Sequence, residues 1–127
     1  MNPKVIIGID LGATNIRGGL VTGEGITGTQ ARAIRSKGTV DEVLQDIFDI
    51  TGLLMNGSVA GIGIGVPSVV DVEKGIVYDV QYIPSWKEVP LKEIMEERYG
   101  IPVFVNNDAN CFALGEFYFG KGIGADH

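Results

Sequence analysis

A carboxylate and several amides follow a short apolar run near the end of the chain. The run Val103–Val105 leads into Asn106, Asn107 and Asp108, and a helical pattern begins at once. Asp108 would therefore lie at the end of a buried strand and on the first turn of a helix, where the helix N-terminus keeps a carboxylate ionised. It could accept the proton of a substrate hydroxyl during phosphoryl transfer, while the Asn107 amide binds a second hydroxyl. The alternative is that Asp108 only caps its helix.

A second polar group lies near the start of the chain, in the turn-rich segment Asp10–Asn15. A tight hairpin presents several backbone N–H groups together, as loops that hold phosphate oxygens do. Gly12 would remove the side chain where a phosphate comes close, and Thr14 would add a hydroxyl donor. The Asp10 carboxylate would repel a polyphosphate directly, so it would act by binding Mg²⁺ or a water molecule of that ion. The alternative is an ordinary hairpin built from turn-forming residues.

Composition indicates one globular α/β domain. The chain has 127 residues, of which 45% are hydrophobic and 20% charged, and its net charge of −6 argues against a nucleic-acid surface. A single cysteine excludes an intramolecular disulfide and fits a reducing compartment. No apolar run approaches the roughly 20 residues of a membrane span. The first residues are followed directly by a strand-like segment and do not have the pattern of a signal peptide. A cytoplasmic protein without a membrane partner is expected.

The order of the predicted elements gives a mixed sheet flanked by helices. Three strands joined by short turns form an antiparallel meander, and helices then alternate with parallel strands. The helix after the meander begins at a capping box, because Glu42 lies three residues after Thr39. The segment 67–90 is expected to be mostly loop. The predicted strands cover 5–9, 16–21, 26–34, 59–66, 75–78 and 101–105, and the predicted helices cover 40–55, 90–99 and 108–119.

The strand predicted at Val59–Val66 has an unusual alternation. Over residues 61–66, isoleucine and valine occupy every second position, and glycine occupies the positions between them. One face of this strand would be branched and apolar, and the other would be bare backbone. A bare face accepts a closely packed helix or a ligand.

Taken together, these segments resemble the ROK family (repressors, open reading frames and sugar kinases) of the actin-like ATPase and hexokinase superfamily. The resemblance covers essentially the whole chain. The stretches that carry it, in order, are Gly8–Arg17, Gly61–Pro67 with Asp71 and Gly75–Val77, Trp86–Leu91, Ile101–Val103, and Asn107–Asn110 with Ala113–Glu116.

The resemblance implies a ribonuclease H-like, actin-like ATPase domain of an ATP-dependent sugar 6-kinase that acts on glucose-like hexoses. Asp108 would be the general base, and Asn107 would hold a neighbouring hydroxyl. The sugar pocket would be lined by the loop after Pro67, including Ser68 and Tyr82. The ATP phosphates and, indirectly through Asp10, Mg²⁺ would be held by Asp10, Gly12, Ala13, Thr14 and Asn15.

The chain departs from the family pattern at three positions. Ser68 replaces a usual glycine, Tyr82 a common asparagine, and Asn106 a frequent glutamate. The first two bear on sugar contacts. A larger departure is that the second domain, with its Glu-x-Gly-His motif and its zinc motif, is missing. We expect residues 1–119 to form the N-terminal domain and residues 120–127 to begin the connection to a C-terminal partner domain, so that the chain alone is not an active kinase.

Two other functions remain open. One is the sugar-sensing part of a ROK transcriptional repressor, although a strand that begins by Val5 leaves no room for a preceding DNA-binding helix pair. The other is a non-catalytic orphan or interaction domain, whose open cleft face would pair with another chain or with a second copy as a homo-oligomer.

Overall fold

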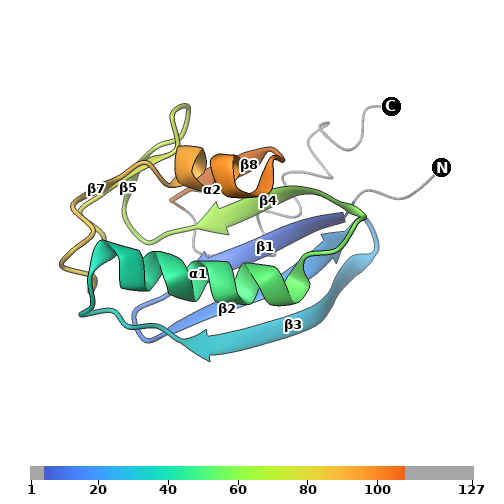
Figure 1. Cartoon of the computed structure of the whole chain (residues 1–127), viewed down its shortest axis with the longest axis horizontal. Coiled ribbons are helices and arrows are strands. Elements are labelled where there is room, and N and C mark those ends of the chain that lie inside the picture. The colour runs from blue at the N-terminus through green and yellow to red at the C-terminus, as the bar shows by residue number, and fades with distance from the viewer. Residues whose placement is uncertain (1–4, 108–127) are drawn as a thin grey trace.

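The computed structural model describes residues 5–107, and its main feature is a five-stranded sheet with the order β3-β2-β1-β4-β8 (Figure 1). β1, β2 and β3 are antiparallel neighbours, while β4 runs parallel to β1 and β8 parallel to β4. The predicted mixed sheet is thereby confirmed. Its strands are β1 Val5–Leu11, β2 Asn15–Thr22, β3 Gly25–Ala33, β4 Val59–Gly65 and β8 Val103–Asn106.

Two helices, α1 (Val40–Leu54) and α2 (Leu91–Tyr99), cover one face of this sheet (Figure 1). α1 begins at the predicted capping box: the Thr39 hydroxyl accepts from the Glu42 N–H at 3.2 Å, and the Glu42 carboxylate accepts from the Thr39 N–H at 3.0 Å. α2 ends as predicted at Gly100, whose φ of 69° is the left-handed conformation that glycine adopts easily. Within residues 5–107, neither helix is long and apolar enough to span a membrane.

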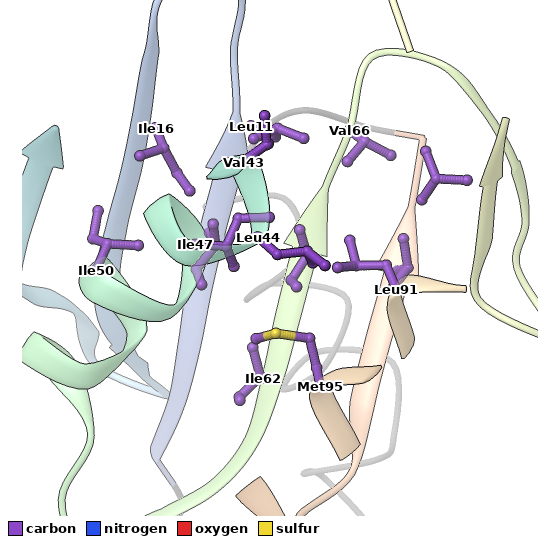
Figure 2. Close-up of a cluster of buried hydrophobic side chains, with 14 of the residues drawn as sticks. Leu11, Ile16, Val43, Leu44, Ile47, Ile50, Ile62, Val66, Leu91 and Met95 are labelled. Atoms are coloured by element: carbon purple, nitrogen blue, oxygen red, sulfur yellow. The ribbon is translucent and has the colours of Figure 1, made fainter. Parts of the chain in front are cut away.

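The core lies between the helices and the sheet. Alternate residues of the central strands face the helices, among them Ile9 on β1 and Ile64 on β4, and both are fully buried. Figure 2 shows side chains of α1 and α2, such as Leu44 and Met95, meeting over these strands. Each fully buried side chain of this size contributes about 1.5–3 kcal/mol relative to an exposed one. The core therefore fixes which face of each strand is left for other contacts.

A second, three-stranded antiparallel sheet follows β4, with the order β5-β6-β7. Only its middle strand was predicted, and the prediction of loop over the rest of 67–90 is wrong for the two outer strands. These are too short to show a period of two, and they are fixed by pairing to the middle strand rather than by their own pattern. The three strands are β5 Val69–Asp71, β6 Ile76–Tyr78 and β7 Glu88–Val89.

Several element boundaries differ from the prediction by one or two residues, among them the starts of α2 and β8. Pro90 is the N-cap residue of α2 and not its first helical residue, and the helix N-terminus is satisfied from outside when the Lys92 N–H donates to the Gly75 carbonyl at 3.2 Å. β8 begins at Val103 and not at residue 101, and the Val103 N–H donates to the Glu96 carboxylate at 3.0 Å. Differences of one or two residues at the ends of elements are ordinary.

Candidate functional site

The carboxyl ends of the three parallel strands bring Asp10, Gly65 and Asn106 side by side. Asp10 on β1 is the Cα partner of Gly65 on β4, and Gly65 is the partner of Asn106 on β8. All three lie on the face opposite the helices, since their neighbours Ile9, Ile64 and Val105 face the core. Ligands of open α/β sheets bind outside these strand ends. The arrangement places a carboxylate and an amide on either side of bare backbone.

The bare face is wider than the sequence pattern suggested. The predicted alternation on β4 is confirmed, since Ile62 and Ile64 are fully buried among core residues. Two residues before Asp10 on β1, and on the same face of the sheet, Gly8 pairs with Gly63 on β4 and with Gly19 on β2. Three residues that lie side by side on adjacent strands are thus all glycines. The sequence shows glycines within all three strands, but that they align side by side follows only from the register.

The hairpin between β1 and β2 is held by its own backbone. The Gly12 N–H donates to the Asn15 carbonyl at 3.0 Å, and a Cβ at Gly12 would lie 2.8 Å from that same oxygen. The hairpin therefore requires glycine at position 12 whether or not a phosphate binds. The Gly12 N–H is also already bonded, so the predicted role of this residue, to leave space for a phosphate, stays a prediction beside its role in the turn.

Other groups of the hairpin remain available. Within the described part of the chain, the N–H groups of Ala13 and Thr14 donate no hydrogen bond, and the side chains of Thr14 and Asn15 are exposed. The Thr14 carbonyl accepts from the Ile34 N–H at 3.0 Å, which ties the hairpin to the end of β3. A fixed loop with free N–H groups can hold anionic oxygens. This is the part of the predicted phosphate site that the geometry favours.

Tyr82 lies at the tip of the β6–β7 hairpin, in a β-turn closed by the Ile83 N–H and the Val80 carbonyl at 3.2 Å. Its φ of 71° is one that glycine or asparagine ordinarily takes at this place in a turn, yet its side chain is 63% exposed. Asp79 also has a positive φ, of 46°. Trp86 anchors this loop. Its side chain is fully buried, and its backbone N–H donates to the Ile83 carbonyl.

The same segment contains buried polar atoms without partners. Among residues 5–107, no hydrogen-bond partner is found for Ser68 Oγ, Ser85 Oγ or Trp86 Nε1. The ladder brings Ser68 opposite Asp79, three residues before Tyr82, because Val69 pairs with Tyr78 in the antiparallel direction. Buried polar groups are ordinarily bonded to protein, water or ligand. Ser68 and the tip of the hairpin therefore offer donors to a bound molecule.

The remaining predicted site residues are placed only in part. Pro67 is half-buried between β4 and β5, and Asn107 is exposed immediately after β8. Asp108, the predicted base, and the helix predicted over 108–119 lie outside the described residues. Within the described part, no three His, Cys, Asp or Glu side chains are close enough together to hold a metal ion. A cation near Asp10 would therefore need oxygen ligands from its substrate or from water.

An open hollow of about 630 Å³ lies elsewhere, between the β5–β6 turn and the outer face of α2. It contains none of the predicted site residues. Its charged lining residues are Glu73, Lys74, Lys92, Glu93, Glu96 and Glu97. Because both signs of charge are present and the hollow is open to solvent, it is not part of the candidate site.

Comparison with known sequences identifies relatives of two functional kinds. The profile described as "ROK family" matches residues 6–127. The glucokinase of Thermotoga maritima is 39% identical over 98% of this chain, and the xylose repressor of Bacillus subtilis is 34% identical over 95% of it. The chain spans only 40% and 33% of the lengths of these two proteins.

Solved structures show the same division. A ROK family glucokinase from Streptomyces griseus, in complex with glucose and AMPPNP, superposes with a TM-score of 0.75 at 36% identity, covering 91% of this chain and 37% of that one. A ROK family transcriptional regulator superposes with a TM-score of 0.70 at 25% identity, covering 91% of this chain and 31% of that one. The fold is therefore that of the ROK glucokinases, and a mixed sheet of the actin-like ATPase kind is confirmed.

Proposed function

The chain belongs to the ROK family, and from that premise we propose that it is the part of an ATP-dependent hexose kinase that carries the general base and the first phosphate loop. The reaction would transfer the γ-phosphoryl group of ATP to the 6-hydroxyl of a glucose-like sugar. The observation that carries the proposal is the row Asp10, Gly65 and Asn106 at the carboxyl ends of β1, β4 and β8. In this row a carboxylate and an amide flank a residue without a side chain, at the strand ends where ligands of such sheets bind.

The sugar would lie beyond β8. Asp108 follows Asn106 by two positions, and its carboxylate would accept the proton of the 6-hydroxyl as the phosphoryl group arrives. An ionised carboxylate is a weak base, which suffices where the transition state is loose and little proton transfer is needed early. Asn107 is exposed at the start of this segment, where its amide can both donate to and accept from a neighbouring hydroxyl.

The opposite wall of the sugar site would be the segment from Pro67 to Tyr82. Its supporting observations are the buried Ser68 hydroxyl, which has no partner among residues 5–107, and the exposed ring of Tyr82 in a strained turn. Strained residues cluster at binding sites, where surrounding structure holds them in place. The family usually has glycine at position 68 and asparagine at position 82. The Ser68 hydroxyl and the Tyr82 ring would contact the hexose hydroxyls differently, so the preference among hexoses would differ as well.

The phosphates would be held by the β1–β2 hairpin through the free N–H groups of Ala13 and Thr14 and the exposed side chains of Thr14 and Asn15. Gly12 keeps the hairpin closed. The Asp10 carboxylate, next to this hairpin, suits a Mg²⁺ ion bound through water, and that ion would neutralise charge on the phosphates when it is bound. Proteins catalyse phosphoryl transfer mainly by positioning the reacting groups and stabilising their charge, and these groups would do both.

A second candidate is the sugar-sensing part of a ROK repressor, favoured by the xylose repressor and transcriptional regulator matches. A repressor needs the sugar site but not the phosphate hairpin or the base. Joining this chain to the remainder of the Thermotoga maritima glucokinase, in place of the segment it matches, tests the two functions directly. ATP-dependent phosphorylation of glucose by this chimera would support a kinase. Sugar binding without turnover would favour a repressor and overturn the kinase proposal.

Two variants of the chimera separate chemistry from folding. Asp108→Asn keeps the shape of the side chain but removes the base, and it should abolish turnover while sugar binding persists. Gln30→Glu, exposed on the edge strand β3 and outside the proposed site, serves as a charge control and should leave turnover unchanged. Full activity of Asp108→Asn would show that Asp108 is not the base, even if the chimera is a kinase.

The 127-residue chain alone should not turn over. It supplies one wall of a cleft whose other wall is expected from a second domain. Incubation with ATP, Mg²⁺ and a panel of hexoses, with mass detection of the phosphorylated sugar, checks this. Turnover at an ordinary kinase rate of about 1–100 s⁻¹ would contradict the expectation that a second domain is needed.

A further inference from the structure

The connection between α1 and β4 contains an asparagine followed by a glycine, and both are exposed. Asn56 and Gly57 lie just after the helix, and Val59 begins the central strand β4. The segment is a tight turn in which the Val59 N–H donates to the Asn56 carbonyl at 3.2 Å. Neither residue belongs to the proposed kinase site, which lies at the other end of β4.

Three features prepare the Asn56 side chain for attack by the next backbone nitrogen. Its Oδ1 accepts a hydrogen bond of 2.7 Å from the Ser58 N–H, which draws electron density from the amide carbon. Within the described part of the chain, the Gly57 N–H donates no hydrogen bond, so this nitrogen is available. A Cβ built at Gly57 would meet nothing within 4 Å, which leaves room for the two groups to approach.

We propose that Asn56 is a site of spontaneous deamidation. The deprotonated nitrogen of Gly57 forms a bond to the side-chain amide carbon of Asn56, and the hydrogen bond from Ser58 stabilises the negative charge that develops on Oδ1. The carbon–nitrogen bond of the side-chain amide then breaks and ammonia leaves, which closes a five-membered succinimide ring. Water opens the ring at either carbonyl and gives aspartate or isoaspartate. The net reaction consumes one water and releases one ammonia.

The products change a structural junction. Aspartate places a negative charge immediately after α1, at the negative end of the helix dipole, and the last turn of α1 has no basic residue to compensate it. Isoaspartate adds a backbone carbon at position 56, three residues before Val59, where β4 begins to pair with Val5 of β1. Both products should lower the stability of the chain, and isoaspartate should do so more because it also displaces the strand.

Peptide mapping by mass spectrometry of the intact chain, aged between neutral and mildly alkaline pH, tests the proposal. The peptide that contains Asn56 should gain the mass difference between an amide and an acid, at a rate that rises with pH because the attacking nitrogen must lose its proton. Asn15 is the internal control: it is exposed too, but a β-branched residue inside a strand follows it. Equal rates at Asn15 and Asn56 would overturn the proposal.

The variant Gly57→Ala gives a second, independent arm. Its methyl group enters open space, so the fold is kept, but it hinders the approach of the nitrogen. The conversion should slow about tenfold, which corresponds to roughly 1.4 kcal/mol in the barrier. Ser58→Ala keeps the N–H that bonds Oδ1 and should leave the rate unchanged. A Gly57→Ala rate equal to that of the wild type, or conversion that occurs only in denaturant, would show that the native turn does not promote the reaction.

Discussion

Asp10 and Asn106 lie on the two strands that flank Gly65 and face the same side of the sheet, with no side chain between them. Neighbouring strands are about 4.8 Å apart, so the two Cα atoms are separated by roughly 10 Å of bare backbone. Gly65 is buried between them, so a side chain there would crowd the region in which, in the kinase that we propose, the reacting groups meet. The glycine at the centre is therefore as much a part of the proposed site as the two polar residues.

A side chain at Gly65 should block this space. In the kinase chimera, we expect Gly65→Ala to lower kcat/KM for glucose by on the order of 100-fold, because a displacement of about 1 Å between reacting groups has that effect. The measurement is steady-state kinetics with ATP and glucose. Gly23→Ala, in the exposed turn between β2 and β3 where a Cβ meets nothing within 4 Å, is the matched control. Equal kinetics for both variants would remove Gly65 from the site.

The segment between β3 and α1 is fastened to the helix by Arg35 and Asp46. The Asp46 carboxylate, which is only 8% exposed, accepts from the Arg35 backbone N–H at 2.8 Å and from its guanidinium at 2.9 Å and 3.1 Å. Asp46→Ala would leave the backbone donor without its partner and should lower the free energy of unfolding by about 1–3 kcal/mol. Urea denaturation measures this. Asp49→Ala, which removes only an exposed bond to Gln45, should cost no more than about 0.5 kcal/mol.

The same pair gives a prediction for pH. The hydrogen bonds that the Arg35 guanidinium donates to Asp46, and then the negative charge of Asp46, raise the pKa of this guanidinium above its ordinary value. A raised pKa contributes stability at every pH below the pKa of unfolded arginine, and that contribution is lost only as pH rises through the folded value, in strong alkali. The stability difference between wild type and Asp46→Asn should therefore be the same at neutral and at mildly alkaline pH. A difference that disappears by mildly alkaline pH would contradict this assignment.

Periodicity was sufficient to predict the larger sheet and α1. Alternation along β4 and the capping box before α1 are local signals, and both are present in the structure. The smaller sheet was missed because Glu88–Val89 and Val69–Asp71 have no pattern of their own and depend on pairing to β6. Element type thus follows from local sequence, whereas the shortest strands follow from neighbours that are distant in the chain.

The candidate site was predictable in its residue types but not in its arrangement. Asp10 and Asn106 were recognised as polar residues at strand ends, yet only the register shows that Gly65 separates them. Gly12 shows the opposite case, because its glycine is required by the Asn15 carbonyl and its N–H is already bonded. A motif position can therefore be fixed by folding alone, even inside a segment that is expected to bind phosphate.

The β5–β6 turn should be intolerant of substitution at Gly75. This residue has a φ of 68°, and a Cβ there would clash with Cβ of Lys92 on α2. Because its carbonyl also caps the α2 N-terminus, any shift that relieves the clash breaks that contact. Gly75→Ala should cost about 2–4 kcal/mol of unfolding free energy, from backbone strain together with overpacking. Gly57→Ala, in an open turn, is the control and should be nearly neutral in the same urea titration.

Tyr82 should show opposite effects on stability and on ligand binding. Its positive φ strains the backbone while its ring stays exposed, so the ring makes little compensating contribution to the fold. Tyr82→Asn should raise the free energy of unfolding by about 0.5–1 kcal/mol, because asparagine adopts this conformation at lower cost. In the chimera, the same variant should change the ratio of kcat/KM values between hexoses that differ at one hydroxyl. Tyr78→Phe, on the neighbouring strand, is the control for loss of a tyrosine hydroxyl and should leave that ratio unchanged. If Tyr82→Asn stabilises the chain but leaves sugar preference unaltered, the strain is real and Tyr82 does not contact the sugar.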